Sequence, residues 1–440
     1  MAKIYDLVID ATEGMIVDPT RKPIRRGCIG IAGESVEKIS DYLLTGKRTI
    51  STKGYVFPGF IDGHVHLRDE EWYSKEDFVS GTRAAINGGV TTVADMPNVP
   101  RPVLTLEDVK RRKELAAKAR CDVVFYGGVT ERNLGELERM APDICGYKIY
   151  VCESTGNLML QPEKLHQALR RIESTGKPVT IHCEDQEMLE EMKRNLGGLE
   201  YPHVHCDLRP PAAEIAAIKD VLSVASGINV HVNIAHTSTA GGLKLVEEYQ
   251  ETHGRARVTC EVTPHHLHFT SHDMSMQGDM LKMNPPLRSE ADRKALFEGL
   301  RDGAIHMLAT DHAPHTREDK MSEKPSGVPN LDDYGRIVSG LIDDGIRLQR
   351  IAEVTSFNPA AYLGLPHRGR IQEGYVADLA IIEKRSIFAG LAAAEPDSSN
   401  EHKIYTKCGW SPYERERFPG VVTYTIHRGQ IVKKDDEVLV

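Results

Sequence analysis

Three features that define whole classes of protein are missing from this sequence. It has no run of about 18 apolar residues, and residues 1–14 contain no apolar secretory segment, so we expect a cytoplasmic protein that does not cross a membrane. No two of the eight cysteines form a Cys-x-x-Cys pair, a pattern typical of reduced, buried thiols. Positively charged residues are also outnumbered, because the chain has 55 Lys and Arg and 64 Asp and Glu, which gives a net charge of −9. That balance argues against nucleic acid as the main partner, since phosphate binding needs a basic surface.

The residues that are present have an ordinary globular composition. Of the 440 residues, 40% are apolar and 27% are charged, which excludes the disordered and fibrous classes. The length exceeds one small domain and suits a barrel of about 250 residues with an accessory module. The 19 histidines are a further indication, since imidazole is a common metal ligand and proton carrier.

Both ends of the chain have the pattern of short strands and tight turns. These strands are residues 5–11, 27–33, 35–40 and 48–52 at the start, and 369–374, 378–383 and 421–432 at the end. Neither end is large enough to bury a core alone, so we expect the two ends to pair. The sequence therefore predicts a small β-sandwich domain formed by residues 1–53 and 368–440, with residues 54–367 between its two parts.

Between the ends, short apolar runs alternate with longer helical stretches, which is typical of βαβ units and a parallel sheet. The eight runs are residues 56–66, 90–96, 122–128, 145–151, 178–183, 229–236, 257–262 and 305–311. The helical stretches include residues 74–88, 105–119, 161–176, 210–226 and 290–303. The expected N-caps are Thr105 and Ser289, and the expected C-terminal stops are Gly88, Gly176 and Gly303. This pattern predicts an α/β fold with a TIM-type (β/α)8 barrel, and the alternative, a doubly wound open sheet, lacks a G-x-G-x-x-G motif after an early strand.

One internal segment, residues 316–333, is polar and rich in Gly and Pro. It predicts a long loop. Long loops inside compact domains are often functional, so the segment is a candidate part of a site.

Polar residues stand at the ends of the predicted barrel strands, where a (β/α)8 barrel has its active face. Their position needs a reason, because burying a polar group without a partner is costly. These residues are His64, His66, Asn98, Lys148, His182, His236 and Asp311.

His64 and His66 are one residue apart on a strand, so their side chains project from the same face. Two such imidazoles can hold one divalent cation. A chance His-x-His is the alternative, but the preceding PGFIDG at the end of an apolar strand favours the metal. His203 and His205 form a second His-x-His in a polar stretch without such a strand, and we interpret that pair as part of a surface loop.

Lys148 lies within an apolar strand and has two interpretations. It either extends to solvent or is converted by carbon dioxide to a carbamate, whose two oxygens would bridge two cations. His182 and His236 each end a strand, and they either make hydrogen bonds in the core or complete the ligands of the second cation. With Asp311 at the last strand, the set of four His, one modified Lys and one Asp suits zinc.

With these residues in place, the sequence resembles the amidohydrolase superfamily and, within it, the dihydroorotase family. The resemblance spans nearly the whole chain through PGFIDGHVHLR, GGVTTVADMPN, GYKIY, IHCED, IAHTST, CEVTPHHL, MNPPLR, ATDHAPH and GRIQEGYVADL. DMPN, CEVTPHHL, MNPPLR and DHAPH favour dihydroorotases over hydantoinases. Hydantoinases usually have a Tyr shortly after the bridging Lys, and here the fifth residue after Lys148 is Glu153.

The resemblance implies a pair of Zn²⁺ ions in each subunit. The ligands of one zinc match His64, His66 and Asp311, and those of the other match His182 and His236. Carboxylated Lys148 and a hydroxide would bridge the two ions.

The resemblance also implies the residues that bind substrate. Arg68, Asn98 and His315 match positions that hold a substrate carboxylate, and Asn284 matches a residue that contacts the ring. The residues after Lys148, especially Glu153 and Ser154, match a mobile loop that closes over substrate in some relatives.

The activity implied is the reversible interconversion of N-carbamoyl-L-aspartate and L-dihydroorotate plus water in de novo pyrimidine (UMP) synthesis. Asp311 is then the catalytic residue, which moves a proton between the attacking water and the ring nitrogen. The alternatives are an allantoinase or hydantoinase-type enzyme and a non-catalytic scaffold homologue, although a scaffold should have lost some of the six ligand positions. The expected partner is a small-molecule substrate, with neither nucleic acid nor a membrane. A homo-oligomer and an association with aspartate carbamoyltransferase are further options.

The chain departs from the family pattern at a few positions. Glu70 and Glu71 stand where relatives commonly have Pro-Gly, and Asn330 stands where a Gly is more usual. These departures concern the rim around the substrate, so they bear on specificity more than on chemistry.

Overall fold

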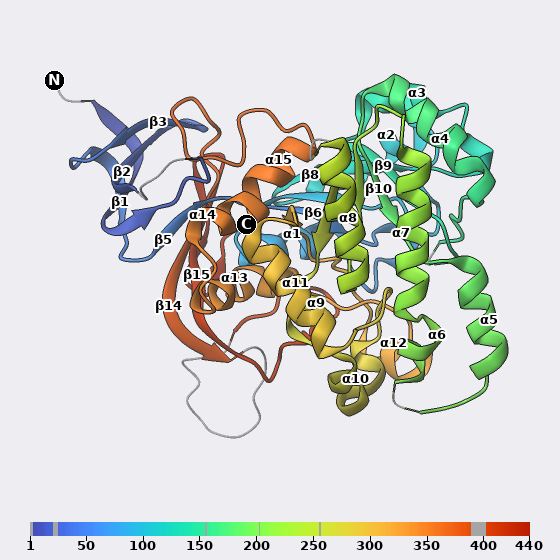
Figure 1. The fold of residues 1–440 in the computed structure, drawn as a ribbon. Helices are drawn as coiled ribbons and strands as arrows, with labels where there is room; N and C mark the ends of the chain where they lie inside the picture. Colours follow the sequence, from blue (N-terminus) through green and yellow to red (C-terminus); the bar gives the residue numbers. More distant parts are fainter. Residues whose placement is uncertain (1–2, 21–24, 155, 202, 255–256, 389–401) are drawn as a thin grey trace.

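The computed structural model describes residues 3–20, 25–154, 156–201, 203–254, 257–388 and 402–440 (Figure 1). Its strands form two sheets, one of eight strands and one of nine strands that come from both ends of the chain. In Figure 1 the first and last strands, drawn in blue and red, lie together on one side of the molecule.

The eight-stranded sheet forms a nearly closed barrel. Each strand pairs in parallel with the next one along the chain. The strands are β6 (Phe60–Val65), β7 (Val90–Asp95), β8 (Asp122–Gly128), β9 (Gly146–Tyr150), β10 (Val179–His182), β11 (Val232–Ile234), β12 (Val258–Val262) and β13 (Met307–Leu308). The seam is joined just past β13, where Val65 bridges His312 and the His66 N–H donates to the His312 carbonyl at 2.8 Å.

A helix follows each barrel strand and covers the outside of the sheet. These helices are α1 (Phe78–Asn87), α2 (Leu106–Leu115), α3 (Leu137–Met140), α4 (Pro162–Thr175), α7 (Pro211–Ala225), α8 (Ala240–His253), α11 (Glu290–Asp302) and α13 (Tyr334–Asp343). The caps agree with the sequence: Thr105 and Ser289 accept backbone N–H bonds at the starts of α2 and α11. Gly88, Gly176 and Gly303 are the C-caps of α1, α4 and α11.

Further helices lie in the connections between these elements. They are α5 (Gln186–Leu196), α6 (Val204–Leu208), α9 (Pro264–His268), α10 (Ser271–Gln277), α12 (Arg317–Ser322), α14 (Leu348–Ala352) and α15 (Asn358–Tyr362). The predicted long loop, residues 316–333, therefore begins as a helix, because Thr316 caps α12 by accepting from the Asp319 N–H.

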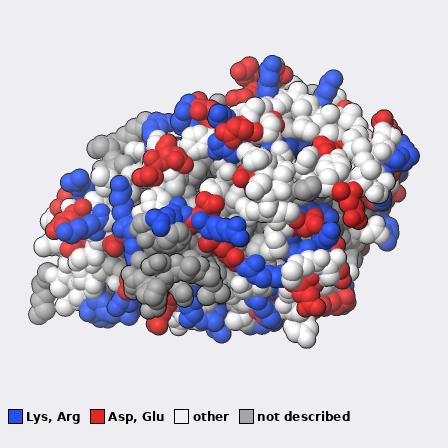
Figure 2. Space-filling model, turned by 90° about the horizontal axis from the view of Figure 1, so that it is seen from below, with Lys and Arg blue, Asp and Glu red and all other residues white. Residues whose placement is uncertain are grey.

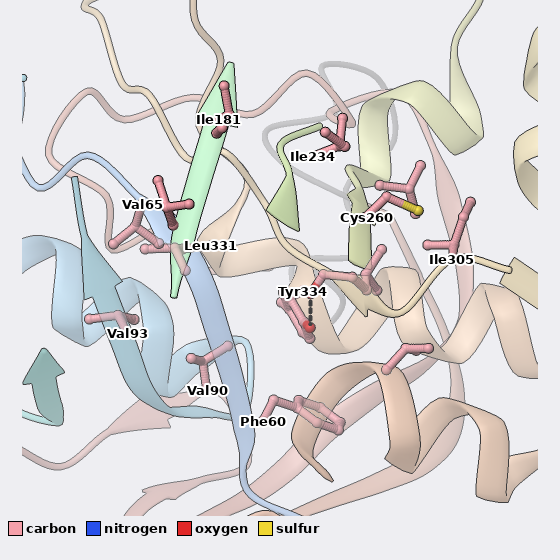
Figure 3. Packing of buried hydrophobic residues seen from close by; sticks show 14 of the residues in the cluster. Phe60, Val65, Val90, Val93, Ile181, Ile234, Cys260, Ile305, Leu331 and Tyr334 are labelled. Carbon is pink, nitrogen blue, oxygen red and sulfur yellow. Dashed lines mark hydrogen bonds between the residues drawn. The ribbon is translucent and has the colours of Figure 1, made fainter. Parts of the chain in front are cut away.

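Buried apolar side chains fill the space between the barrel and its helices (Figure 3). Phe60 of β6 packs on Tyr334 of α13, with ring centroids 5.4 Å apart. The Tyr334 hydroxyl donates to the Leu308 carbonyl at 2.9 Å, the bond dashed in Figure 3. One helix is thereby attached to the first and last barrel strands, which supports the seam from outside.

The nine-stranded sheet is built from both termini. Its strands are β1 (Ile4–Ile16), β2 (Arg25–Ala32), β3 (Ser35–Ser40), β4 (Thr45–Ser51), β5 (Tyr55–Pro58), β14 (Leu379–Phe388), β15 (Arg417–His427), β16 (Gln430–Lys434) and β17 (Glu437–Val438). The two termini meet where β5 pairs with β1 in parallel and with β14 antiparallel. The predicted fold class, a (β/α)8 barrel with a separate β module from both ends, is confirmed.

The division of the chain at residues 53 and 368 remains a proposal. The strand β5 connects its two parts, because it pairs with terminal strands and then leads directly into β6. A small apolar core that includes Ile9, Leu379 and Ile426 gives the terminal sheet its own packing.

All eight cysteines are free thiols, six of them buried, as the sequence predicts. Within the described residues no helix is long and apolar enough to cross a bilayer. On the face drawn in Figure 2, basic and acidic side chains are interspersed and neither sign forms a large patch.

Candidate active site

The carboxyl ends of the barrel strands surround one cavity that contains nearly all of the predicted site residues. Those that line it are His64, His66, Arg68, Asn98, Lys148, His182, His236, Asn284 and Asp311. Residues from seven separate parts of the chain therefore converge at this end of the barrel, as the strand-end pattern predicts. His315 does not line the cavity and is described below with Arg68.

His64 and His66 enter the cavity from the end of β6, with ring centroids 5.4 Å apart. Asp311 reaches them across the seam, and its Oδ1 lies 3.3 Å from His64 Nε2 and 2.9 Å from His66 Nε2. Burial lowers the pKa of His66 to about 4, so this ring is neutral at pH 7 and keeps a lone pair for a cation. Burial alone would raise the pKa of Asp311, but His64 and His66 hold that pKa well below its usual range.

His182 and His236 form a second pair beside the first. His182 Nδ1 lies 2.9 Å from His236 Nε2, and the ring centroids of His236 and His64 are 5.4 Å apart. One ligand atom each from His64, His236 and Asp311 lies within 4.8 Å of the others. Burial lowers the pKa of both His182 and His236, so these rings are also neutral donors.

Two of these residues lie on strained backbone. His236 has a φ of 32° and Asp311 a φ of 48°, values that non-glycine residues rarely adopt. Such strain costs on the order of 1–3 kcal/mol and persists where the surroundings enforce it, typically at functional sites. Here it turns both side chains from their strand ends into the cavity.

Lys148 lies in the middle of β9 and is fully buried, so the interpretation in which it extends to solvent is wrong. Its Nζ has no hydrogen-bond partner among the described residues and lies 5.1 Å from the centroid of the Tyr150 ring. Burial lowers the pKa of Lys148 to about 8. The carbamate stays a prediction, and an unpaired buried amine is the group that such a modification would convert into an anion.

The imidazoles at the end of β6 are oriented by side chains bound to their other ring nitrogens. His64 Nδ1 lies 2.5 Å from Glu261 Oε1, and His66 Nδ1 lies 2.6 Å from Asn98 Oδ1. These contacts leave each Nε2 directed at Asp311. The predicted substrate residue Asn98 therefore also orients a predicted metal ligand. Glu261 was not predicted from the sequence.

His182 is oriented in the same way, by a buried ion pair. Its Nε2 lies 2.8 Å from Glu184 Oε2, and Arg209 Nε donates to Glu184 Oε1 at 3.0 Å. Burial would raise the pKa of Glu184, but Arg209 and His182 lower it, so the carboxylate is ionised. Sequence reasoning missed both residues. Glu184 follows His182 by two positions, a spacing that could have indicated it, whereas nothing in the sequence indicates Arg209.

Arg68 presents free donors to the cavity. It is 2% exposed, and its Nε and Nη1 have no partner among the described residues. Its Nη2 lies 3.5 Å from His315 Nε2, and its guanidinium lies 5.4 Å from the Trp72 ring centroid. Burial lowers the pKa of Arg68 to about 10, so it is charged at neutral pH. Adjacent free N–H groups on a buried guanidinium are suited to bind a planar anion such as a carboxylate.

His315 stands beside Arg68 rather than on the cavity wall. Its Nδ1 lies 3.1 Å from Lys75 Nζ, and its Nε2 lies 3.2 Å from the Ser326 carbonyl oxygen. Burial, with Arg68 and Lys75 nearby, holds the pKa of His315 well below its usual value, so the ring is neutral. From this position His315 supports the Arg68 guanidinium. A direct contact between His315 and the substrate carboxylate stays a prediction.

Asn284 lies on the cavity wall. Its Oδ1 accepts from Ser326 Oγ at 3.1 Å and lies 2.9 Å from His205 Nε2. The interpretation of His205 as part of a surface loop is wrong, because it belongs to α6 and is half-buried. His203 is exposed, so only one member of that His-x-His reaches the site.

Sequence reasoning also missed Tyr150, which lines the cavity two residues after Lys148. Residues i and i+2 of a strand share a face, so the position of Lys148 carried a signal for Tyr150. The Tyr150 hydroxyl is buried and has no partner among the described residues. It is a further hydrogen-bond donor at the cavity.

The residues that depart from the family pattern lie off the cavity wall. Glu70 pairs with Arg111 at 3.2 Å, and Glu71 is exposed. Asn330 is buried, and its Nδ2 donates to the Thr310 carbonyl at 2.7 Å. From the segment after Lys148, Ser154 lines the cavity and Glu153 does not.

The chemistry of this donor set fits a divalent metal pair. The rings of His66, His182 and His236 are neutral, the Asp311 carboxylate beside them is ionised, and the buried Lys148 amine has no hydrogen-bond partner among the described residues. Nitrogen and oxygen donors of this kind are the ones zinc takes in catalytic sites.

Comparison with known proteins decides the family. A model of the amidohydrolase family matches residues 55–432. The chain belongs to the amidohydrolase family. A dihydroorotase from Methanosarcina mazei is 34% identical over 414 residues, which cover 91% of this chain and 87% of that protein. A dihydroorotase from Pyrococcus abyssi is 35% identical over 416 residues, covering 94% and 92% of the two chains.

Solved structures of other amidohydrolases agree with the fold. An L-hydantoinase from Arthrobacter aurescens superposes with a TM-score of 0.92 at 25% identity and covers 99% of this chain and 98% of its own. A D-hydantoinase at 24% identity has a TM-score of 0.88 and covers 99% and 96%. The prediction of an amidohydrolase is confirmed by these findings.

Proposed function

We propose that this protein is a zinc-dependent dihydroorotase, which interconverts N-carbamoyl-L-aspartate and L-dihydroorotate plus water in de novo pyrimidine synthesis. The relatives named dihydroorotase at 34–35% identity support a cyclic amide as the substrate. The observation that carries the finer assignment is Arg68, a buried cation in the cavity whose Nε and Nη1 have no hydrogen-bond partner within the described part of the chain.

Arg68 supports an anionic substrate because its Nε and Nη1 have no hydrogen-bond partner among the described residues. Dihydroorotate carries a carboxylate that a guanidinium can bind through two parallel hydrogen bonds. A ring without a carboxylate would leave the buried N–H groups unpaired, at a cost of about 1–3 kcal/mol for each buried group. We assign Arg68 to the carboxylate, together with His315 beside it and Asn98 on the wall of the same cavity.

The metal ligands in this proposal are the four imidazoles, Lys148 as its carbamate, and Asp311. Zinc, when bound there, would lower the pKa of a water molecule from ~15.7 towards ~7 and polarise the amide carbonyl. Glu261, Asn98 and Glu184 hold the imidazoles in the orientation that this role needs.

Asp311 is the proposed proton carrier. It is ionised, so it can accept a proton from the attacking water. It then delivers that proton to the ring nitrogen as the amide bond breaks, and the reverse sequence closes the ring. The carboxylate clamp at Arg68 keeps the ring amide in one position while the proton moves.

A hydantoinase is the second candidate, favoured by the solved structures that this chain resembles. The two candidates differ in the charge of the ring that they open. Assays of purified protein with L-dihydroorotate, hydantoin and allantoin separate them.

The test of the proposal is dihydroorotate hydrolysis before and after chelation, with zinc added back. We expect hydrolysis that is lost on chelation and restored by zinc, and faster turnover of dihydroorotate than of the uncharged rings. A preference for hydantoin would replace the proposal with the second candidate. Full activity in metal-free protein would contradict the zinc dependence.

A further inference from the structure

Two segments that are distant in the sequence form one wall of the cavity. We call them the rim: residues 282–284, which end in Asn284, and residues 325–327, which include Ser326 and Gly327. The Gly327 N–H donates to the Lys282 carbonyl at 2.9 Å, and Ser326 Oγ donates to Asn284 Oδ1 at 3.1 Å. The rim is thus a single surface made by two loops.

A buried amine contacts both of these loops. Lys320 of α12 is 1% exposed. Its Nζ donates to the carbonyl oxygens of Lys282 at 3.0 Å, Pro325 at 3.0 Å and Gly327 at 3.1 Å. Among the described residues it forms no ion pair with a carboxylate, so its three donors serve the rim backbone.

The chemistry of this contact is specific to an amine at this position. An ammonium has three N–H donors, which equals the number of rim carbonyls that it contacts. Burial lowers the pKa of Lys320 to about 7, and the neutral amine would still donate to two of the three carbonyls. An apolar side chain of the same length would leave all three carbonyls without this donor.

We propose that Lys320 is a positioning residue that fastens the two rim loops so that Asn284 and Ser326 meet the bound ring. The effect extends to the carboxylate end of the cavity, because the Ser326 carbonyl oxygen also lies 3.2 Å from His315 Nε2, beside Arg68. For the identity of the bound ring, this inference rests on the proposed function.

The test compares Lys320→Met with Lys324→Met in the zinc-loaded protein. Lys324 belongs to the same segment, but its side chain is about half exposed and pairs with Asp279 at 3.3 Å, so its substitution removes a charge without touching the rim carbonyls. Lys320→Gln keeps two N–H donors and serves as a milder variant if Lys320→Met does not fold.

The first readout separates substrate binding from chemistry. We expect Lys320→Met to raise KM for dihydroorotate roughly tenfold, equivalent to about 1.4 kcal/mol, with kcat changed by less than about threefold. Lys320→Gln should lie between wild type and Lys320→Met, and Lys324→Met should match wild type. Equal KM values in wild type and Lys320→Met would overturn the inference, as would a parallel loss of kcat and melting temperature at unchanged KM.

The second readout does not depend on the reaction. Hydrogen exchange of the Gly327 amide, which bonds to the Lys282 carbonyl, reports opening of the rim. We expect faster exchange in peptides that cover residues 282–288 and 324–328 of Lys320→Met, with unchanged exchange in the barrel strands. If wild type does not hydrolyse dihydroorotate, the proposed function fails while this readout still decides the role of Lys320. Unchanged exchange at the rim would overturn it.

Discussion

At the scale of single residues, the cavity contains donors that the protein itself does not satisfy. Arg68 Nε and Nη1, Lys148 Nζ and the Tyr150 hydroxyl are buried and without partners among the described residues. Leaving one buried polar group unpaired costs about 1–3 kcal/mol. Several unpaired donors in one cavity indicate that the cavity binds groups that the chain itself does not supply, namely an anion, a covalent modification or a metal.

Replacing Arg68 by Lys tests the anion. Arg68→Lys keeps the charge but loses the planar fork, so we expect KM for dihydroorotate to rise about tenfold or more, with a small change in melting temperature. Steady-state kinetics and thermal unfolding measure the two effects. An unchanged KM would remove Arg68 from the substrate contact.

Replacing Asp311 by Asn tests the proton carrier. Asp311→Asn keeps the shape but cannot accept a proton, so we expect kcat to fall by roughly 10²–10⁴-fold while circular dichroism shows an intact fold. Asp343→Asn, at the exposed end of α13, is the matched control and should leave kcat unchanged. Near-normal turnover in Asp311→Asn would contradict the assigned role.

The residues that sequence reasoning found and those that it missed differ in how they are encoded. His64, His66 and His182 stand at strand ends, and a strand end can be located from a local pattern. Arg209 reaches the site only because α6 and α7 bring that part of the chain over β10, and no local pattern records this approach. His205 is the converse case, since its polar surroundings suggested a surface although the fold brings it to Asn284.

At the scale of secondary-structure elements, two carboxylates behind the imidazoles orient His64 and His182 at the strand ends. Glu261 of β12 orients His64 at the end of β6, whereas Glu184 orients His182 at the end of its own strand, β10. A change in one such carboxylate should act on metal affinity and leave the barrel folded.

Glu184→Gln is the direct test of this arrangement. We expect zinc affinity to fall roughly 10–100-fold, because the amide loses the charge that fixes His182 and pairs with Arg209. Metal content measured in competition with a chelator gives the affinity. Glu187→Gln, an exposed substitution on α5, is the control, and equal zinc retention in the two variants would contradict the role.

Helices and strands could be predicted where the apolar periodicity or a helix cap was clear in the sequence. The connections between them were harder to predict. The eight barrel strands and the caps at Thr105 and Ser289 follow from the sequence. The segment 316–333 reads as a loop because it is polar and rich in Gly and Pro, yet its first part is helical and its later part is held by Lys320. The contacts of Lys320 with backbone carbonyls of other segments cannot be inferred from the sequence around Lys320.

At the scale of the whole molecule, the terminal sheet is joined to the barrel through buried polar contacts. Lys433 of β16 is 1% exposed, and its Nζ donates to Asn87 Oδ1 at the end of α1. Burial lowers the pKa of Lys433 to about 8 from an ordinary 10.5.

This contact predicts a pH dependence of stability. Between about pH 8 and pH 10.5 the unfolded chain binds more protons at Lys433 than the folded chain, so its contribution to the free energy of unfolding rises with pH over that window. The rise is on the order of 3 kcal/mol at most. Urea unfolding of wild type and Lys433→Met at pH 8, 9 and 10 measures it, with a steeper rise expected in wild type than in the variant, because other buried amines such as Lys148 contribute equally to both. Parallel curves would contradict the prediction.

The pairing of β5 with β14 has a consequence for synthesis of the protein. The ribosome makes β1–β5 first, but β14, the antiparallel partner of β5, emerges only after every barrel strand has been translated. Until then the β5 edge is open to unrelated chains. A chain whose synthesis stops before β14 would therefore have a complete barrel and an unpaired strand edge at β5. Chaperones and proteases would recognise such an edge.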